Sequence, residues 1–135
     1  MKKRNLRRAL AGATLIVLGG AMFVNPANAV YTCGKGQICM FKDNDFRNTV
    51  AVEPAFQHSG GELDNFGHNH FTNGTVVDGQ VSSVVNNSDF CLALFDGTNL
   101  TGANDVVPPH TSGNLYGFND KASSGVTYPG SETCR

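Results

Sequence analysis

The feature that most constrains this chain is a short pattern of residues that occurs twice. Each copy has an aromatic residue, four polar residues suited to a turn, an apolar residue, one further residue and then Asn or Gly. The copies run from Phe41 to Asn48 and from Phe95 to Gly102. Asn and Gly readily adopt the positive φ that a tight turn requires. The chain therefore predicts two similar hairpins and a duplicated domain.

A second block of residues follows each hairpin. It reads Asp-Gly-Gln-Val-Ser-Ser at 78–83 and Asn-Asp-Lys-Ala-Ser-Ser at 119–124. From Ile38 onward, short apolar runs alternate with segments rich in Gly, Asn and Asp, which is typical of many short strands. We expect an all-β sandwich of two Greek keys, in which the open face of each half packs on the other half.

Residues 1–29 have the organisation of an export signal. Five basic residues and no acidic residue begin the segment, a mostly apolar run follows at 9–24, and Ala27-Asn28-Ala29 provides a small-x-small cleavage site. A membrane anchor is the alternative, but the run of about 16 residues is shorter than the roughly 20 that a spanning helix needs. We predict a signal peptide at 1–29, cleavage before Val30, and a secreted domain at 30–135.

Charge is divided unevenly between these two segments. Five of the ten basic residues lie in 1–29 and all eleven acidic residues lie after it, so residues 30–135 carry a formal charge of −6. Phosphate binding needs clustered Lys and Arg, so this balance excludes a basic nucleic-acid-binding domain. A domain of about 106 residues also excludes a large multidomain enzyme. We expect no nucleic-acid partner, and no membrane partner after cleavage.

The four cysteines all lie in the predicted mature segment, at Cys33, Cys39, Cys91 and Cys134. An even number of cysteines in an exported domain indicates disulfide bonds. Four cysteines allow three pairings, and the short spacing from Cys33 to Cys39 suits a local clasp, which leaves Cys91 with Cys134. A zinc site is the alternative, but no Cys-x-x-Cys pair is present. We expect the disulfides Cys33–Cys39 and Cys91–Cys134, which would stabilise so small a domain.

The sequence contains few signs of a catalytic site. Glu62 and Asp64 are close in the chain, but nothing marks a buried pair of carboxylates. If all four cysteines are bridged, no thiolate nucleophile remains. The many serines have no nucleophile-elbow motif around them. We predict that the protein is not an enzyme.

The duplicated pattern resembles the hairpin of βγ-crystallin Greek keys, and residues 119–124 match the calcium signature of that superfamily in full. More closely, the mature chain resembles peptidase inhibitor family I36, the family of the Streptomyces metalloproteinase inhibitor. The segments that carry this resemblance are Cys33 to Cys39, 39–46, 81–87 and 116–124. The resemblance covers nearly all of 30–135 and implies a disulfide-stapled, βγ-crystallin-like sandwich.

The resemblance also implies bound calcium. This cation takes about six to eight oxygen ligands from carboxylates, amides, hydroxyls and carbonyls. In the crystallin pattern the block of one half supplies ligands, and the hairpin loop of the other half completes the site. The candidate ligands are Asn119, Asp120, Ser123, Asp78, Ser82, Asp43 and Asp45. Gly79 stands where the signature has an acidic or amide residue, which removes one oxygen from the first block. The alternative is that these residues close turns and hold the Greek keys without a metal.

Three functions follow from the resemblance. The first is a secreted inhibitor of extracellular metalloproteases, in which an exposed loop occupies the cleft as a poor substrate. The loops 54–80 and 103–117 are candidates, and the inhibitory bond is not assigned, since the chain lacks the second close cysteine pair that frames it in the inhibitor naming the family. The second is a calcium-binding structural or stress module, and the third is a killer-toxin-like antimicrobial. We expect the first, with a protease as partner and the domain as a monomer.

Overall fold

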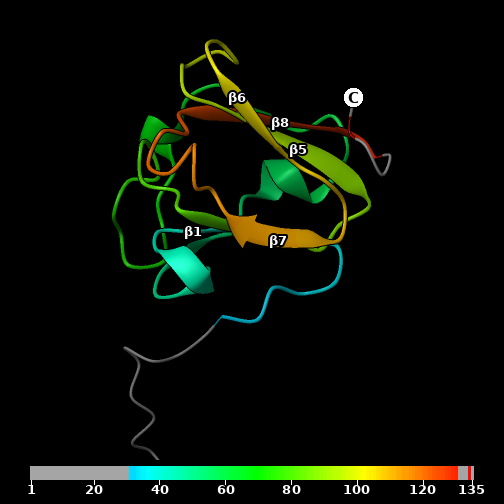
Figure 1. Cartoon of the computed structure of the whole chain (residues 1–135), viewed down its shortest axis with the longest axis horizontal. Helices are drawn as coiled ribbons and strands as arrows, with labels where there is room; N and C mark the ends of the chain where they lie inside the picture. Colours follow the sequence, from blue (N-terminus) through cyan, green and yellow to red (C-terminus); the bar gives the residue numbers. More distant parts are fainter. Residues whose placement is uncertain (1–30, 131–133, 135) are drawn as a thin grey trace, which may run out of the picture.

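The computed structural model describes residues 31–130 and 134, so the predicted signal peptide at 1–29 lies outside the described residues. The described chain forms two sheets that pack face to face (Figure 1). Three short 3-10 turns connect some of the strands. The elements in chain order are β1 (Ile38–Phe41), η2 (Asn44–Phe46), β2 (Val50–Ala51), η3 (Pro54–Gln57), β3 (Glu62–Leu63), η4 (Phe66–His68), β4 (Ser83–Asn86), β5 (Phe90–Phe95), β6 (Asn104–Val107), β7 (Thr111–Asn114) and β8 (Ser124–Pro129).

The strands of the two halves interlock. The first sheet has the order β2-β1-β4-β7 and the second sheet has the order β3-β8-β5-β6. The third strand of each half pairs in the sheet of the other half, because β3 pairs with β8 and β7 pairs with β4, both antiparallel. The predicted all-β sandwich of two Greek keys is confirmed. The sequence predicted that the open face of each half packs on the other half. In the structure each half also contributes its third strand to the sheet of the other half.

The core lies between the inner faces of the two sheets. Alternation along each strand sends every second side chain inward, and the 3-10 turns of the long loop at 54–80 add two phenylalanines. Phe56 and Phe66 are both fully buried and meet edge to face, with ring centroids 6.2 Å apart. The other largest fully buried apolar side chains of the core are Ile38, Met40, Val77, Val81, Val84, Leu92 and Leu94.

Gly125 on β8 makes room for these two rings. A Cβ at this position would lie 2.9 Å from Cζ of Phe56 and 3.2 Å from Cζ of Phe66. The loop at 54–80 is therefore fastened to the core through its aromatic residues, and it approaches the backbone of the second half where that backbone has no side chain.

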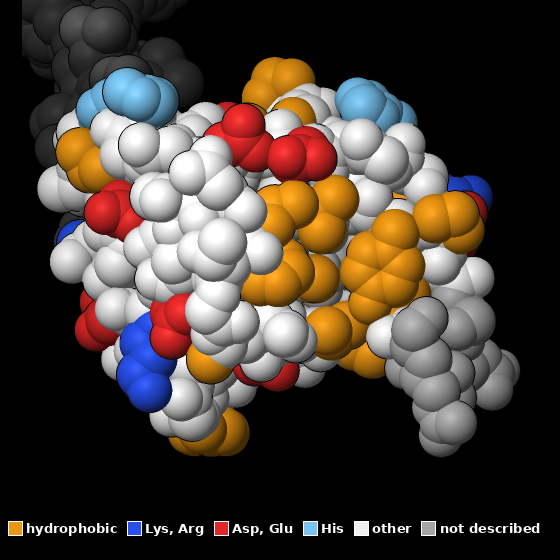
Figure 2. Space-filling model, turned by 90° about the horizontal axis from the view of Figure 1, so that it is seen from above, with side chains coloured by type: hydrophobic (Ala, Val, Ile, Leu, Met, Phe, Trp, Pro, Cys, Tyr) orange, Lys and Arg blue, Asp and Glu red, His pale blue; other side chains and the backbone are white. Residues whose placement is uncertain are grey.

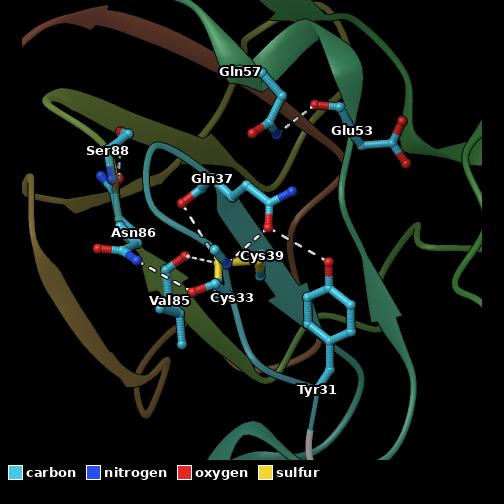
Figure 3. Close-up of a disulfide and its surroundings, with 11 residues drawn as sticks. Tyr31, Cys33, Gln37, Cys39, Glu53, Gln57, Val85, Asn86 and Ser88 are labelled. Atoms are coloured by element: carbon cyan, nitrogen blue, oxygen red, sulfur yellow. Dashed lines mark hydrogen bonds between the residues drawn. A yellow bond between two sulfur atoms is a disulfide. The ribbon is translucent and has the colours of Figure 1, made fainter.

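The outer face of the first sheet carries a smaller apolar cluster built from Cys39, Phe41 and Val50. Figure 3 shows the disulfide that joins Cys39 to Cys33 beside this cluster. The chain turns between these two cysteines. The side chain of Gln37 stabilises this turn, since its Oε1 accepts a hydrogen bond from the Gly34 amide at 2.8 Å. The chain ahead of β1 is thus clasped to the first sheet.

The outer face of the second sheet is also apolar. Figure 2 looks onto this face and shows hydrophobic side chains gathered over β5, β6 and β8. The second disulfide joins Cys91 on β5 to Cys134, and the Tyr128 hydroxyl donates to the Cys134 carbonyl at 3.0 Å. The two disulfides are the pairing expected from the cysteine spacing. No helix among the described residues is long and apolar enough to cross a membrane.

Candidate functional site

The two hairpin loops have positive φ at three equivalent positions, one of which is the closing Asn or Gly that the sequence pattern predicts. In each loop, positive φ occurs at the residue before the second apolar position, at that position itself, and at the closing Asn or Gly. The angles are 60° at Asp45, 58° at Phe46, 63° at Asn48, 57° at Asn99, 56° at Leu100 and 85° at Gly102. The duplication therefore extends from the sequence to the backbone.

The last serine of each block holds the hairpin of its own half. Ser83 Oγ donates to the Asp43 carbonyl at 2.6 Å and accepts from the Phe46 amide at 3.1 Å. Ser124 Oγ donates to the Gly97 carbonyl at 2.6 Å and accepts from the Leu100 amide at 3.0 Å. These serines saturate backbone groups in the tight turns, which is a structural role that needs no metal.

The two blocks lie side by side where the halves meet. The Gly79 amide donates to the Ala122 carbonyl at 2.9 Å, and the Asp120 amide donates to the Val81 carbonyl at 3.0 Å. Across this junction, Ser82 Oγ donates to Asp120 Oδ1 at 3.1 Å. The hydroxyl of the first block therefore meets the carboxylate of the second block, which is a pairing that reading each block separately missed.

Each of the remaining candidate ligands has surroundings of its own. Two hydrogen bonds join Asp45 to Asn114. The Asp45 backbone amide donates to Asn114 Oδ1 at 2.7 Å, and Asn114 Nδ2 donates to the Asp45 carboxylate at 3.0 Å. Asp78 is exposed, and Ser123 is fixed by its amide to the Phe95 carbonyl at 2.7 Å. Asn119 Oδ1 is buried without a hydrogen-bond partner. The described residues contain no group of three or more His, Cys, Asp or Glu side chains arranged to hold a metal ion.

The carboxylates considered for catalysis lie in the open. Glu62 and Asp64 are both exposed. A hydrogen bond with Asp64, followed by repulsion from the Asp64 charge, raises the pKa of Glu62 above its usual value. A catalytic acid is typically tuned by burial in a cleft. This exposed pair lacks that environment.

The two candidate loops differ in how they are built. The loop at 54–80 contains β3 and two 3-10 turns and buries Phe56, Phe66, Phe71 and Val77. The segment at 103–117 contains the longer strands β6 and β7. Sequence reasoning missed β7 since its residues, Thr-Ser-Gly-Asn, lack alternating apolar side chains. Both segments have accessible stretches, among them 58–60 and 72–76 in the first segment and Thr111 to Gly113 with Tyr116 in the second.

Comparison with known proteins bears on both the fold and the family. The model of peptidase inhibitor family I36 matches residues 26–107, and no curated protein matches the chain. A structure described as "Evolution of the eye lens beta-gamma-crystallin domain fold" is similar with a TM-score of 0.59 at 16% identity, covering 76% of this chain and 96% of that chain.

Two further solved structures agree with this fold. The N-terminal domain of protein S has a TM-score of 0.54 at 17% identity, covering 69% of this chain and 96% of that chain. A βγ-crystallin domain from Flavobacterium johnsoniae has a TM-score of 0.52 at 21% identity, covering 68% of this chain and 93% of that chain. At such low identity these similarities establish the βγ-crystallin fold alone.

The family match covers more than half of the chain and includes the first hairpin, the first block, and the strands up to β6. It supports a protease-inhibitor role in general terms, which points to a non-enzymatic protein with a protease as partner. The two disulfides are consistent with an extracellular protein. The chain belongs to peptidase inhibitor family I36, and its domain has the βγ-crystallin fold.

Proposed function

We propose that the domain at 30–135 is a secreted inhibitor of extracellular metalloproteases, which it blocks by presenting an exposed segment to the cleft. The observation that carries this proposal is the family match over residues 26–107. The preference for metalloproteases follows from the resemblance of the segments 39–46 and 116–124 to the family of the Streptomyces metalloproteinase inhibitor.

The construction of the domain supports this function. An inhibitor that occupies a protease cleft as a poor substrate must unfold only rarely, because proteases cleave the unfolded chain. Here two disulfides tie both ends of the domain to the sheets, and the long loop at 54–80 is anchored through buried aromatic residues. Such a domain can present an accessible segment while the rest of the chain resists cleavage.

The proposal predicts inhibition by the mature protein at about micromolar concentration or below, a range that a specific protein interface readily provides. A metalloprotease of the thermolysin class and a serine protease are titrated with residues 30–135, and cleavage of a peptide substrate is followed. We expect the metalloprotease to be inhibited and the serine protease to be unaffected. The control is the reduced and alkylated protein, which should be digested. Full metalloprotease activity at saturating domain concentration would rule out this target class.

We further propose that calcium binds at the junction of the two blocks, because the contact between Ser82 and Asp120 favours it. A carboxylate and a hydroxyl lie together there, and Ser83, the neighbour of Ser82, is bonded to the Asp43 carbonyl in the hairpin loop. These are the oxygen types that calcium prefers, and Asp120 and Ser82 would hold the ion. In the first block, Gly79 stands at the position that Asp120 has in the second block. Because glycine offers no side-chain oxygen there, we expect a single ion.

Calcium is then expected to stabilise the wild-type protein and not the Asp120→Ala variant, which removes both side-chain oxygens. At a free calcium concentration of about 100 times Kd, binding to the folded state alone would add about 2.7 kcal/mol to the free energy of unfolding. Thermal unfolding with calcium and with a chelator measures this shift. Asp64→Ala is the matched control, since it removes the same side chain from an exposed position outside both blocks. Equal calcium-induced shifts of the melting temperature in both variants would show that calcium does not bind at the junction.

A further inference from the structure

The four edges of the two sheets differ in how they are protected. Edge strands expose unpaired backbone groups, and proteins commonly protect them by shortness, charge or proline. β2 and β3 have two residues each, and β3 includes Glu62. β6 contains Asp105 and is followed by Pro108 and Pro109. β7 has four residues with no charge and no proline, which makes it the unprotected edge among the described strands.

The register of β7 shows which of its backbone groups are available. The Leu115 amide donates to the Ser82 carbonyl at 2.9 Å, next to the pair formed by Asn114 and Ser83. Hydrogen-bonded and non-hydrogen-bonded pairs alternate in an antiparallel ladder. Asn114 and Ser112 therefore occupy non-hydrogen-bonded positions opposite β4. Their amides and carbonyls point away from the sheet, as an added strand would require.

The surroundings of this edge are open. Thr111, Ser112 and Gly113 are exposed, and a Cβ at Gly113 or at Gly117 would meet no atom within 4 Å. β6 and β7 line a shallow groove of about 190 Å³, with Val106 and Leu115 among its lining residues. An extended chain could therefore lie along β7 without displacing other parts of the domain.

Tyr116 follows this edge and is 85% exposed, the most exposed of the large hydrophobic side chains in the described residues. Its hydroxyl accepts from Asn114 Nδ2 at 3.3 Å, and the same amide group donates to Asp45. A tyrosine with a restrained ring provides a large contact area at low entropic cost. Tyrosine is also enriched among the residues that dominate binding energy at interfaces.

We propose that β7 and Tyr116 form the surface that occupies the protease cleft. A protease binds its substrate as an extended strand paired through main-chain hydrogen bonds, and an unpaired, uncharged edge strand matches that mode. The amides and carbonyls of Ser112 and Asn114 pair with the cleft backbone, and the Tyr116 ring enters a side-chain pocket. This inference rests on the proposed inhibitory function and assigns it to one edge of the first sheet.

Two matched pairs of variants test this surface in the protease titration. Ser112→Pro removes an outward amide and leaves the bonds between β4 and β7 in place, whereas Ser112→Ala keeps the amide. Tyr116→Ala removes the exposed ring, and Tyr31→Ala removes another exposed tyrosine, 39% exposed, as its control. We expect Ser112→Pro to weaken inhibition about tenfold or more and Tyr116→Ala about 30-fold, with the two controls within about threefold of wild type. Melting temperatures verify that each variant is folded.

The outcomes separate this inference from the function on which it rests. If wild type inhibits and all four variants inhibit equally, the edge assignment is wrong while the inhibitory function stands. If wild type inhibits no metalloprotease, the function fails and the assignment fails with it. Light scattering of the free protein provides a further check. A dimer that Ser112→Pro dissociates would show that a second copy uses the edge, which would overturn the assignment to a protease.

Discussion

Replacing Phe66 with alanine is expected to lower the free energy of unfolding by about 3–5 kcal/mol, because it removes a large ring from the packed core. Phe66 is fully buried and meets Phe56 edge to face. Its amide also donates to the Ser123 carbonyl at 2.8 Å, so the ring sits where the long loop of the first half is fastened to the second half. Urea unfolding followed by tyrosine fluorescence or circular dichroism measures the loss.

Two variants bracket this result. Phe66→Leu keeps most of the buried volume and should lose less stability than the alanine variant. Tyr116→Ala removes an aromatic ring of similar size from an exposed position and should change stability by no more than about 0.5 kcal/mol. If Phe66→Ala costs less than about 1 kcal/mol, the ring does not anchor the loop and the described core is wrong at this point.

Removing the disulfide between Cys91 and Cys134 is expected to cost about 4 kcal/mol, and removing that between Cys33 and Cys39 only about 2.4 kcal/mol. The difference follows from the chain that each bond closes, since the sequence separations are 43 and 6 residues. A small domain has only about 5–15 kcal/mol of stability in total. The variant without the longer-range bond should therefore be close to unfolding at physiological temperature.

Paired alanine substitutions at each bond make this comparison without leaving an unpaired thiol. Denaturant unfolding gives the two losses, and incubation with a nonspecific protease gives a second measure through the rate of digestion. The expected order is wild type, then the variant without the Cys33–Cys39 bond, then the variant without the Cys91–Cys134 bond. The reverse order would show that native-state contacts of the clasp at Cys33 outweigh the loop-closure term.

Local turn chemistry is what made much of this fold predictable. The positive φ at Asn48 and Gly102 follows from residue types that tolerate it, and the hairpin pattern repeats because both turns need the same backbone. The role of Ser83 and Ser124, the last residues of the two blocks, was also predictable, because a hydroxyl can satisfy backbone groups in such turns. These features depend on residues close together in the sequence.

Features that depend on distant pairing could not be read in this way. Nothing in the composition of Glu62-Leu63 specifies β8 as its partner, and Thr111–Asn114 lacks the apolar alternation that marks a half-buried strand. The contact between Ser82 and Asp120 likewise arises only when the two halves meet. The sequence therefore indicated the oxygen donors of the junction but not how they combine.

The exchange of third strands makes each half depend on the other. A single half would leave its own sheet one strand short and would carry one strand with no sheet to join, so it could complete the sandwich only by associating with another copy. The covalent connection at 87–89, between β4 and β5, turns that encounter into an intramolecular one with a high effective concentration. The protein is thus organised like a dimer within one chain, in which each half completes the sheet of the other.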